Sequence, residues 1–137
     1  MKRISILLVS LLPLLLMAQQ QTEQEKKSEK QIRQYFFVML TAGKDRSQDS
    51  ATAANIQEGH MANINRLYNE GKLKVAGPFG DEGKWVGIFI FDCANKEEVE
   101  KLLVTDPAVK SGRLAYEIHP WWTSPVGSFT VGKPNKS

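Results

Sequence analysis

Two almost uninterrupted apolar runs place the strongest constraint on how this chain can fold. Residues 35–40 (YFFVML) and 85–91 (WVGIFIF) are rich in aromatic and β-branched side chains and are short for helices. A polar loop with Gly43 and Asp45 follows the first run. Both runs therefore predict β-strands. Such strands in an antiparallel sheet need cover on both faces, because a solvated face shows polar residues at alternate positions.

Helical spacing predicts two helices. In residues 52–70, one face of the segment is largely apolar, and Gly71 ends it. The residues that form this stripe are Ile56, His60, Ile64 and Leu67. Asn95 is a suitable cap for a second helix that runs through Leu103.

Two further strands complete a βαββαβ order. Residues 73–76 predict a short strand closed by Gly77 and Pro78, and residues 113–120 alternate between apolar and other side chains. This order packs most economically as an α+β, ferredoxin-like fold, a four-stranded antiparallel sheet with two helices on one face. The first and third strands are then central, which agrees with their apolar composition. Pro78 suits an edge strand.

The two helices of this fold can cover only one face of the sheet. The other face would expose one alternate set of the first strand, and the two sets are Tyr35, Phe37 and Met39, or Phe36, Val38 and Leu40. An apolar patch of that size is unusual on a monomer. We therefore predict a homodimer that packs sheet to sheet.

The first 18 residues have the layout of a secretory signal peptide. Lys2 and Arg3 precede an apolar run, and Ala18 offers a small residue for cleavage. The run contains Pro13 and is shorter than the about 20 apolar residues of a spanning helix, so an uncleaved anchor is the weaker alternative. We expect a periplasmic or secreted protein without stable membrane insertion after cleavage.

The rest of the chain divides by composition. Residues 19–34 are polar and glutamine-rich, and we expect a disordered or fraying helical spacer there. Residues 35–122 form the predicted folded domain. Residues 123–137 contain several Gly and Pro residues and are expected to be an irregular tail.

Charge and cysteine content exclude several classes of function. The chain has 18 Lys and Arg against 15 Asp and Glu, and removal of Lys2 and Arg3 brings it close to neutral, so no nucleic-acid partner is expected. A single cysteine, Cys93, excludes an internal disulfide framework. Two histidines and one cysteine are too few for a zinc-finger cage, and we expect neither a metal nor a cofactor.

His60 is the titratable member of the apolar helical stripe. It is either a packing residue bonded to a nearby carbonyl or a reactive group, and in both cases its buried polar atoms need a partner. Asp106 is the natural partner, although an Asp before Pro107 also suits the cap of a turn through residues 108–112. If the two meet, the carboxylate fixes the ring tautomer and leaves the second ring nitrogen free as a general base.

Other candidate residues surround this pair in the expected fold. Gly77 and Pro78 are expected to shape a substrate pocket, and Trp121 either covers that pocket or seals the dimer. His119 is expected to face solvent or to line a cleft. Cys93 is expected to be a packing residue and not a reactive thiol.

Several segments together resemble the YCII-related (YciI-like) family. They are residues 60–78 (HMANINRLYNEGKLKVAGP), Phe79-x-Asp81-x-Gly83, Asp106-Pro107-x-Val109-x-x-Gly112 and Pro120-Trp121. The resemblance covers roughly residues 35–122. It implies a dimeric α+β barrel with an active pair at His60 and Asp106. The chain has Ile56 and Gln57 where family members often carry an Arg, which weakens the expectation of an anionic substrate.

The resemblance also implies a type of chemistry. Family members include a dehydrochlorinase acting on a chlorinated hydroxyquinol, so we expect a small lyase- or isomerase-type enzyme acting on a ring or enol substrate, with His60 as general base and Asp106 orienting it. The alternative is a non-catalytic dimeric module of the cell envelope that binds a small ligand or a protein partner. That alternative predicts an accessible pocket without contact between His60 and Asp106.

Overall fold

The computed structural model describes residues 17–23 and 32–123, in two units. One unit is Gln34–Trp122, and the other comprises the segments before and after it. Residues 17–23 are helical, so the first part of the predicted spacer is a helix where it is described. Residues 1–16 of the predicted signal peptide, residues 24–31 and residues 124–137 lie outside the described residues. No helix within the described ranges is long and apolar enough to cross a membrane.

The unit Gln34–Trp122 contains the predicted four-stranded antiparallel sheet. Its order is β2 (Leu73–Pro78), β3 (Trp85–Phe91), β1 (Arg33–Ala42) and β4 (Leu114–Thr123). The two apolar runs are the central strands, which confirms the predicted α+β, ferredoxin-like fold. Three strands are longer than expected, because β1 includes the last residues of the predicted spacer, β2 includes Gly77 and Pro78, and β4 continues through Trp122 to Thr123. Pro120 is tolerated because β4 is an edge strand.

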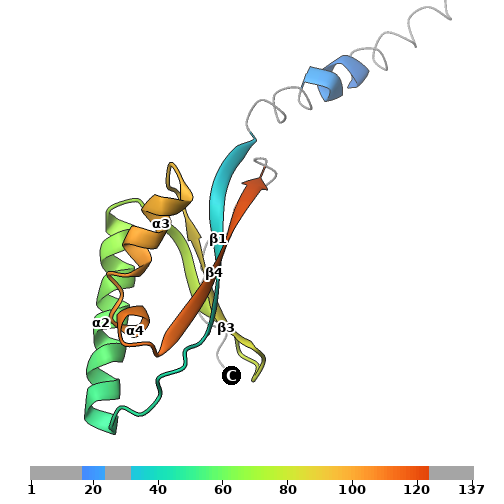
Figure 1. Ribbon diagram of the computed structural model, residues 1–137. Helices are drawn as coiled ribbons and strands as arrows, with labels where there is room; N and C mark the ends of the chain where they lie inside the picture. The colour runs from blue at the N-terminus through green and yellow to red at the C-terminus, as the bar shows by residue number, and fades with distance from the viewer. Residues whose placement is uncertain (1–16, 24–31, 124–137) are drawn as a thin grey trace, which may run out of the picture. The chain divides into compact units, whose positions relative to one another are not determined.

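Helices of the same unit cover one face of this sheet, as the edge-on view in Figure 1 shows. They are α2 (Ser50–Asn69), α3 (Lys96–Leu103) and the short α4 (Pro107–Lys110). Asn95 caps α3 as predicted, accepting a hydrogen bond from the backbone N–H of Glu98. The prediction of two helices was incomplete, because a third helix, α4, begins at Pro107. Asp106 is its N-cap, and Pro107 occupies its first position.

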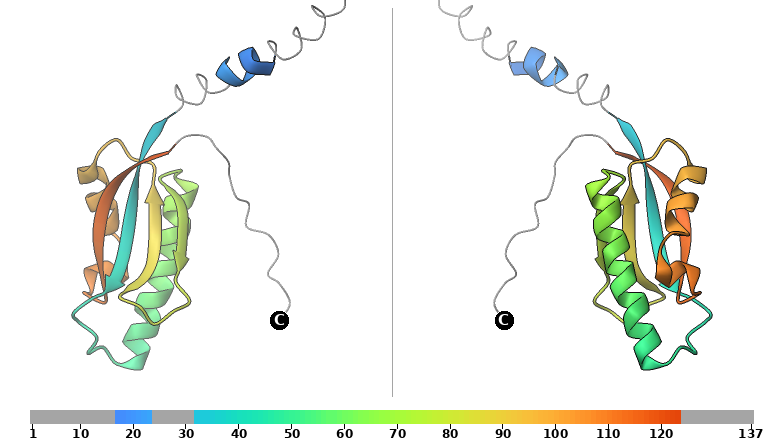
Figure 2. Two further views of the ribbon diagram at one scale, coloured as in Figure 1. Left: turned by 90° about the vertical axis from the view of Figure 1, so that its right-hand side faces the viewer. Right: turned by 90° about the vertical axis from the view of Figure 1, so that its left-hand side faces the viewer.

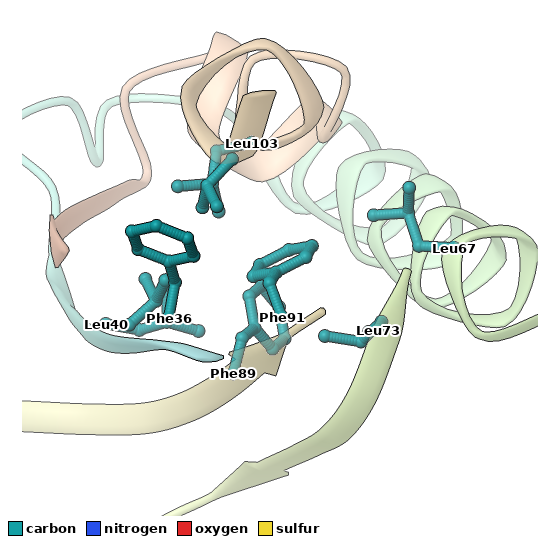
Figure 3. Packing of buried hydrophobic residues seen from close by; sticks show 9 residues of the cluster. Phe36, Leu40, Leu67, Leu73, Phe89, Phe91 and Leu103 are labelled. Carbon is teal, nitrogen blue, oxygen red and sulfur yellow. The ribbon is translucent and has the colours of Figure 1, made fainter. Parts of the chain in front are cut away.

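The hydrophobic core fills the space between the sheet and the helices. Figure 3 shows Phe36 and Phe91 from the central strands pointing toward Leu103 of α3. The phenyl rings of Phe89 and Phe91 meet edge to face, with centroids 5.8 Å apart. Residues opposite each other in the β1–β3 pairing point to the same face, so Val38 opposite Phe89 and Phe36 opposite Phe91 form one continuous inner layer.

The second face of the sheet carries no helix within the unit Gln34–Trp122, as the left view of Figure 2 shows. We call it the open face and define it by its apolar side chains. These are Tyr35, Phe37, Met39, Ile88, Ile90 and Trp121. Phe37 pairs with Ile90 and Met39 with Ile88. The first of the two predicted alternate sets of β1 is therefore the one on this face, where its members are half-buried.

Candidate functional site

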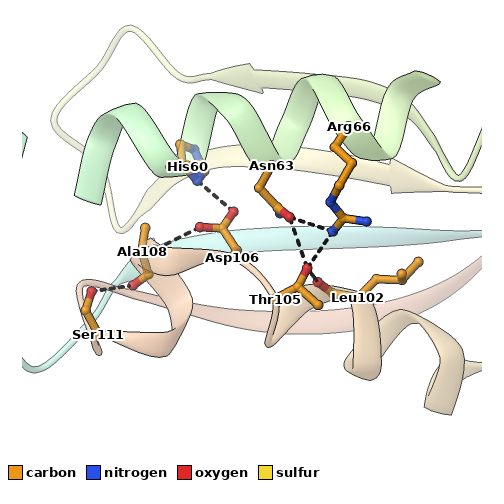
Figure 4. Close-up of polar contacts among 8 residues, drawn as sticks. All are labelled: His60, Asn63, Arg66, Leu102, Thr105, Asp106, Ala108 and Ser111. Atoms are coloured by element: carbon orange, nitrogen blue, oxygen red, sulfur yellow. Dashed lines mark hydrogen bonds and ion pairs between the residues drawn. The ribbon is translucent and has the colours of Figure 1, made fainter. Parts of the chain in front are cut away.

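His60 and Asp106 meet on the helix-covered side of the sheet. His60 Nδ1 lies 2.7 Å from Asp106 Oδ2, and Asp106 is fully buried. The second carboxylate oxygen, Oδ1, accepts a hydrogen bond of 2.8 Å from the backbone N–H of Ala108. Figure 4 shows both contacts. The two roles considered for Asp106, helix cap and histidine partner, are therefore filled at once by its two oxygens.

Local structure on both sides holds this contact in place. Asp106 belongs to the junction between α3 and α4, and its neighbour Thr105 accepts a hydrogen bond of 2.9 Å from Arg66 of α2. Asn63 of α2 accepts a second hydrogen bond from the same guanidinium, at 2.7 Å. The Thr105 hydroxyl also donates a hydrogen bond of 3.0 Å to Asn63, so its contacts with Arg66 and Asn63 tie the junction to α2, and Asn63 lies one turn after His60 (Figure 4). Asn63 is buried, and the sequence analysis missed it because an amide does not mark an apolar stripe.

Gly59 allows α4 to approach α2 closely. A Cβ atom at this position would lie 2.8 Å from Cγ of Pro107, which is closer than packed side chains tolerate. Because Pro107 follows Asp106 directly, the absence of a side chain at Gly59 permits the short distance between Asp106 and His60.

The second ring nitrogen of His60 faces accessible space. Nδ1 is the ring atom bonded to Asp106, and Nε2 has no hydrogen-bond partner within the described part of the chain. Across the same residues, no sealed side-chain nitrogen or oxygen is left without a partner. Nε2 is therefore open to solvent, although the His60 side chain as a whole is only 11% exposed. The ring also stacks on Phe89, with centroids 6.1 Å apart.

A cavity of about 360 Å³ adjoins His60. It lies between α2 and one end of the sheet, and Ile56, Phe89 and Ala108 form part of its apolar wall. Its volume falls within the range of small-molecule sites, near the lower end. An imidazole whose Nδ1–H is held by a carboxylate, and whose Nε2 opens on such a cavity, can accept a proton from a bound molecule.

The structure brings four of the five predicted site residues together. Gly77 and Pro78 line the same cavity as His60, and Asp106 contacts Nδ1 of His60 without lining the cavity. Trp121 is the exception, because its indole lies on the open face and contacts Tyr35 and Phe37, with centroids 6.3 and 6.2 Å away. The alternation of side chains along β4 places Trp121 opposite to the inward residues of that strand. It is therefore not part of this cavity.

The remaining chemically notable side chains lie elsewhere. His119 is exposed on β4, where its Nε2 is 3.8 Å from Glu117. Cys93 follows β3 and packs beside the core, and its burial, assisted by the charge of Glu98, raises the pKa of its thiol to about 11. In residues 17–23 and 32–123, no three His, Cys, Asp or Glu side chains gather as a metal-binding group.

Two arginines in the cavity wall were not predicted. Arg46 lies in the loop between β1 and α2, and Arg113 directly precedes β4. Arg46 belongs to no motif or periodic stripe, and Arg113 was included only as the first residue of the predicted alternating strand. Their contribution depends on how the loop and the strand approach each other, which local sequence does not reveal.

The comparison with protein families agrees with the fold and the motifs. The model of the YCII-related domain matches residues 35–122. The chain belongs to the YCII-related family. A curated relative is the protein YjpA of Bacillus subtilis (strain 168), which is 30% identical over 87 residues, or 64% of this chain and 94% of that protein.

Two solved structures resemble the domain. A crystal structure of muconolactone isomerase matches with a TM-score of 0.55 and 17% identity, over 72% of this chain and 99% of that one. The 5-chloro-2-hydroxyhydroquinone dehydrochlorinase TftG from Burkholderia phenoliruptrix AC1100, in complex with 2,5-dihydroxybenzoquinone, matches with a TM-score of 0.47 and 20% identity, over 64% and 92%. The likeness to muconolactone isomerase supports the fold assignment alone.

Proposed function

We propose that this protein is a small lyase- or isomerase-type enzyme in which His60 removes a proton from a carbon of a ring or enol substrate. The observation that carries the proposal is the 2.7 Å contact between His60 Nδ1 and the buried carboxylate of Asp106, with Nε2 open beside a cavity. In this arrangement Nδ1 keeps its proton and Nε2 is the base. General base catalysis of this kind contributes about 10²- to 10⁴-fold in rate.

Asp106 has an orienting role in this proposal and does not itself exchange protons with the substrate. Its oxygens are occupied by His60 and by the backbone of Ala108, so the carboxylate is fixed relative to α4. A fixed acceptor selects one tautomer of the ring and stabilises the imidazolium that forms after proton transfer.

The alternative of a non-catalytic binding module predicted a pocket without contact between His60 and Asp106. The contact is present, so that prediction of the alternative is wrong. A packing role for His60 is the interpretation that the experiment has to separate from catalysis.

The test measures exchange of carbon-bound protons for deuterium by NMR. The full-length chain is incubated in D₂O with a panel of cyclic 1,3-diketones and β-keto acids. We expect faster exchange for at least one compound, and a loss of at least about 100-fold in His60→Gln. Absence of acceleration across the panel, or unchanged exchange in His60→Gln, would contradict the proposal.

Two further variants separate catalysis from packing. His119→Gln removes the other histidine, which lies on β4 outside the cavity, and should leave exchange unchanged. Asp106→Asn keeps an oxygen for the Ala108 N–H but presents an amide donor to His60, which favours the tautomer protonated on Nε2. Exchange should therefore fall strongly. If His60→Gln lowered only the free energy of unfolding, the packing interpretation would be correct.

We also propose that two copies of the domain associate through the open face to form a homodimer. The apolar side chains of this face, Phe37 and Ile90 among them, have no helix over them within the unit Gln34–Trp122. Sedimentation velocity at micromolar concentration should show a dimer. A monodisperse monomer would contradict the association.

We propose further that the protein is exported to the periplasm or the medium. The support is the order of Lys2 and Arg3, the apolar run and Ala18 near the start of the sequence. N-terminal sequencing of the exported protein should give a first residue close to position 19. Recovery of intact Met1 with the membrane fraction would indicate an uncleaved anchor.

A further inference from the structure

Two arginine residues line the same cavity as His60. Arg46 is exposed and Arg113 is half-buried, and they come from segments far apart in the sequence. The backbone brings these segments together. The N–H of Gly43 donates to the carbonyl of Arg113 at 2.8 Å, and the N–H of Asp45 donates to that of Gly112 at 3.1 Å.

Glycine is required for this approach. A Cβ atom on Gly43 would overlap the backbone of Gly112, and Gly112 itself has a positive φ of 74°. The loop before α2 therefore lies directly against the start of β4. Arg46 on the loop and Arg113 before β4 are therefore held at the same end of the cavity.

Each arginine side chain donates one hydrogen bond within the described residues. Arg113 Nη1 donates to Oε1 of Gln48 at 2.8 Å, and the amide of Gln48 donates in turn to the carbonyl of Ser111 at 3.3 Å. Arg46 Nη1 donates to the carbonyl of Arg113 at 3.2 Å. Each guanidinium carries five N–H donors, so most donors of both groups are left for another acceptor.

The charge at this end of the cavity is not balanced. Within the described ranges, neither arginine has a carboxylate oxygen within ion-pair distance. Asp45 is an acidic side chain that interacts with Arg113. Hydrogen bonds from Ser47, and to a smaller extent the charge of Arg113, hold the pKa of the Asp45 carboxyl below its usual range. Asp45 is therefore ionised at neutral pH, and the three side chains together leave a single positive charge, which suits a monoanion.

We infer that Arg46 and Arg113 bind the carboxylate of a small ligand in this cavity. Planar guanidinium groups present paired donors that match the two oxygens of a carboxylate. The inference deepens the proposed function and rests on it in one respect, because it names the substrate class as small carboxylates that also carry an acidic C–H. In the reaction, that proton moves to His60 Nε2, and the electron pair of the C–H bond moves into the neighbouring carbonyl to give an enolate.

The binding test compares benzoate with benzamide, two probes of similar shape that differ in charge. NMR titration of the full-length chain with each probe should show that benzoate binds at least 10-fold more tightly. The preference should shrink as NaCl is raised, because part of the attraction is between exposed charges. Equal affinity for the two probes, or no detectable benzoate binding, would overturn the inference. So would inorganic phosphate binding more tightly than benzoate.

Variants assign the preference to the two arginines. Arg46→Gln and Arg113→Gln should each weaken benzoate binding about 10-fold or more and leave benzamide binding nearly unchanged. Arg113→Lys keeps the charge without the planar fork and should show a partial loss. The matched control is Lys44→Gln, because Lys44 is an exposed cation in the same loop that does not line the cavity. An equal loss in the control would show a general charge effect and overturn the assignment.

A second readout separates this inference from the proposed function. Deuterium exchange at the C–H between the carbonyl groups is followed for acetoacetate and for its neutral amide, acetoacetamide. His60→Gln should remove the catalysed part of the exchange of acetoacetate, whereas the preference for benzoate over benzamide should remain. Benzoate preference without any catalysed exchange would overturn the proposed catalysis and the substrate role while supporting the carboxylate site. His60-dependent exchange without preference for either anionic probe would support the catalysis and overturn the carboxylate site.

Discussion

The two faces of the sheet use the same strands for different purposes. On the helix-covered face, five inward apolar side chains of the central strands are at most 4% exposed, namely Phe36, Val38, Leu40, Phe89 and Phe91. On the open face, the intervening residues are only half-buried, and Trp121 is 40% exposed. The buried polar side chains of the described residues, His60, Asn63 and Asp106, belong to the helices and junction on the covered side.

The difference between the two faces shows that a single copy of the domain has both its core and its candidate site on the helix-covered face. The covered face has a packed core at one end of the helices and a cavity beside His60 at the other. The open face contributes less to the stability of a single copy, because no helix within the unit Gln34–Trp122 packs over it. We therefore expect substitutions on neighbouring residues of one strand to have different kinds of effect.

The largest expected effect comes from Phe91→Ala on the covered face. Truncation of a fully buried phenylalanine should lower the free energy of unfolding by about 3–5 kcal/mol, because it removes apolar contacts and leaves a cavity. Urea denaturation at several protein concentrations measures this cost, which should be the same at each. Ile90→Ala, one residue away, should cost less, and its cost should depend on concentration. A loss below about 1 kcal/mol for Phe91→Ala would contradict the comparison of the faces.

The second effect concerns association through the open face. Ile90→Asp places a charge where the homodimer would bury it, and the dissociation constant should rise at least about 100-fold, which corresponds to about 2.7 kcal/mol. Circular dichroism should show an unchanged fold, since Ile90 is not part of the core. Sedimentation equilibrium gives the dissociation constant.

A matched control for this experiment lies on the covered side. Val104 is 53% exposed just after α3, so Val104→Asp introduces the same charge outside the open face. Its dimer should be as stable as that of the unmodified protein. If both variants dissociated alike, the open face would not be the interface.

The sequence predicted the fold well because most of the signal is local and periodic. Continuous apolar runs identified the central strands, and Asn95 marked the start of α3. The motifs also identified the pair His60 and Asp106, which the structure places in contact. Trp121 shows the limit of this approach, because the strand was predicted to end at residue 120 and its alternation was therefore not extended to Trp121.

The charged end of the cavity was beyond prediction for a physical reason. Arg46 and Arg113 lie outside the helices and strands. Two backbone hydrogen bonds bring their segments together, one from Gly43 to Arg113 and one from Asp45 to Gly112. No periodicity records such a contact. The absence of an Arg near His60 on the helix had weakened the expectation of an anionic substrate, whereas the structure supplies cationic groups from a loop and a strand start.

A smaller effect is expected where α4 packs on α2. Gly59→Ala adds a methyl group against Pro107 and should lower the free energy of unfolding by about 1 kcal/mol, as a packing cost of about 2 is partly offset by better helix propensity. It should also slow deuterium exchange, because displacement of α4 moves Asp106 away from His60. Gly80→Ala, with no atom within 4 Å of the added Cβ, is the control. A stabilised Gly59→Ala variant with full activity would show that the close approach is not needed.

The smallest expected effect concerns Cys93, and it tests whether packing on the covered side protects the thiol from alkylation at the end of β3. Cys93 is half-buried beside the core, and burial raises the pKa of its thiol to about 11. At pH 8 the thiolate is therefore scarce, and iodoacetamide should modify the folded protein roughly 100-fold more slowly than the urea-unfolded chain, whose thiol has a pKa of about 8.5.

The fold favours the protonated form of the Cys93 thiol. The half-buried Cys93 thiol therefore contributes fully to the free energy of unfolding at pH values below the pKa of the unfolded thiol. This contribution declines as the pH rises toward 11. Cys93→Ser should lack this decline, whereas lysines titrating in the same range affect both proteins equally. Rapid modification of the folded protein at pH 8 would mean that the covered side does not extend to the end of β3.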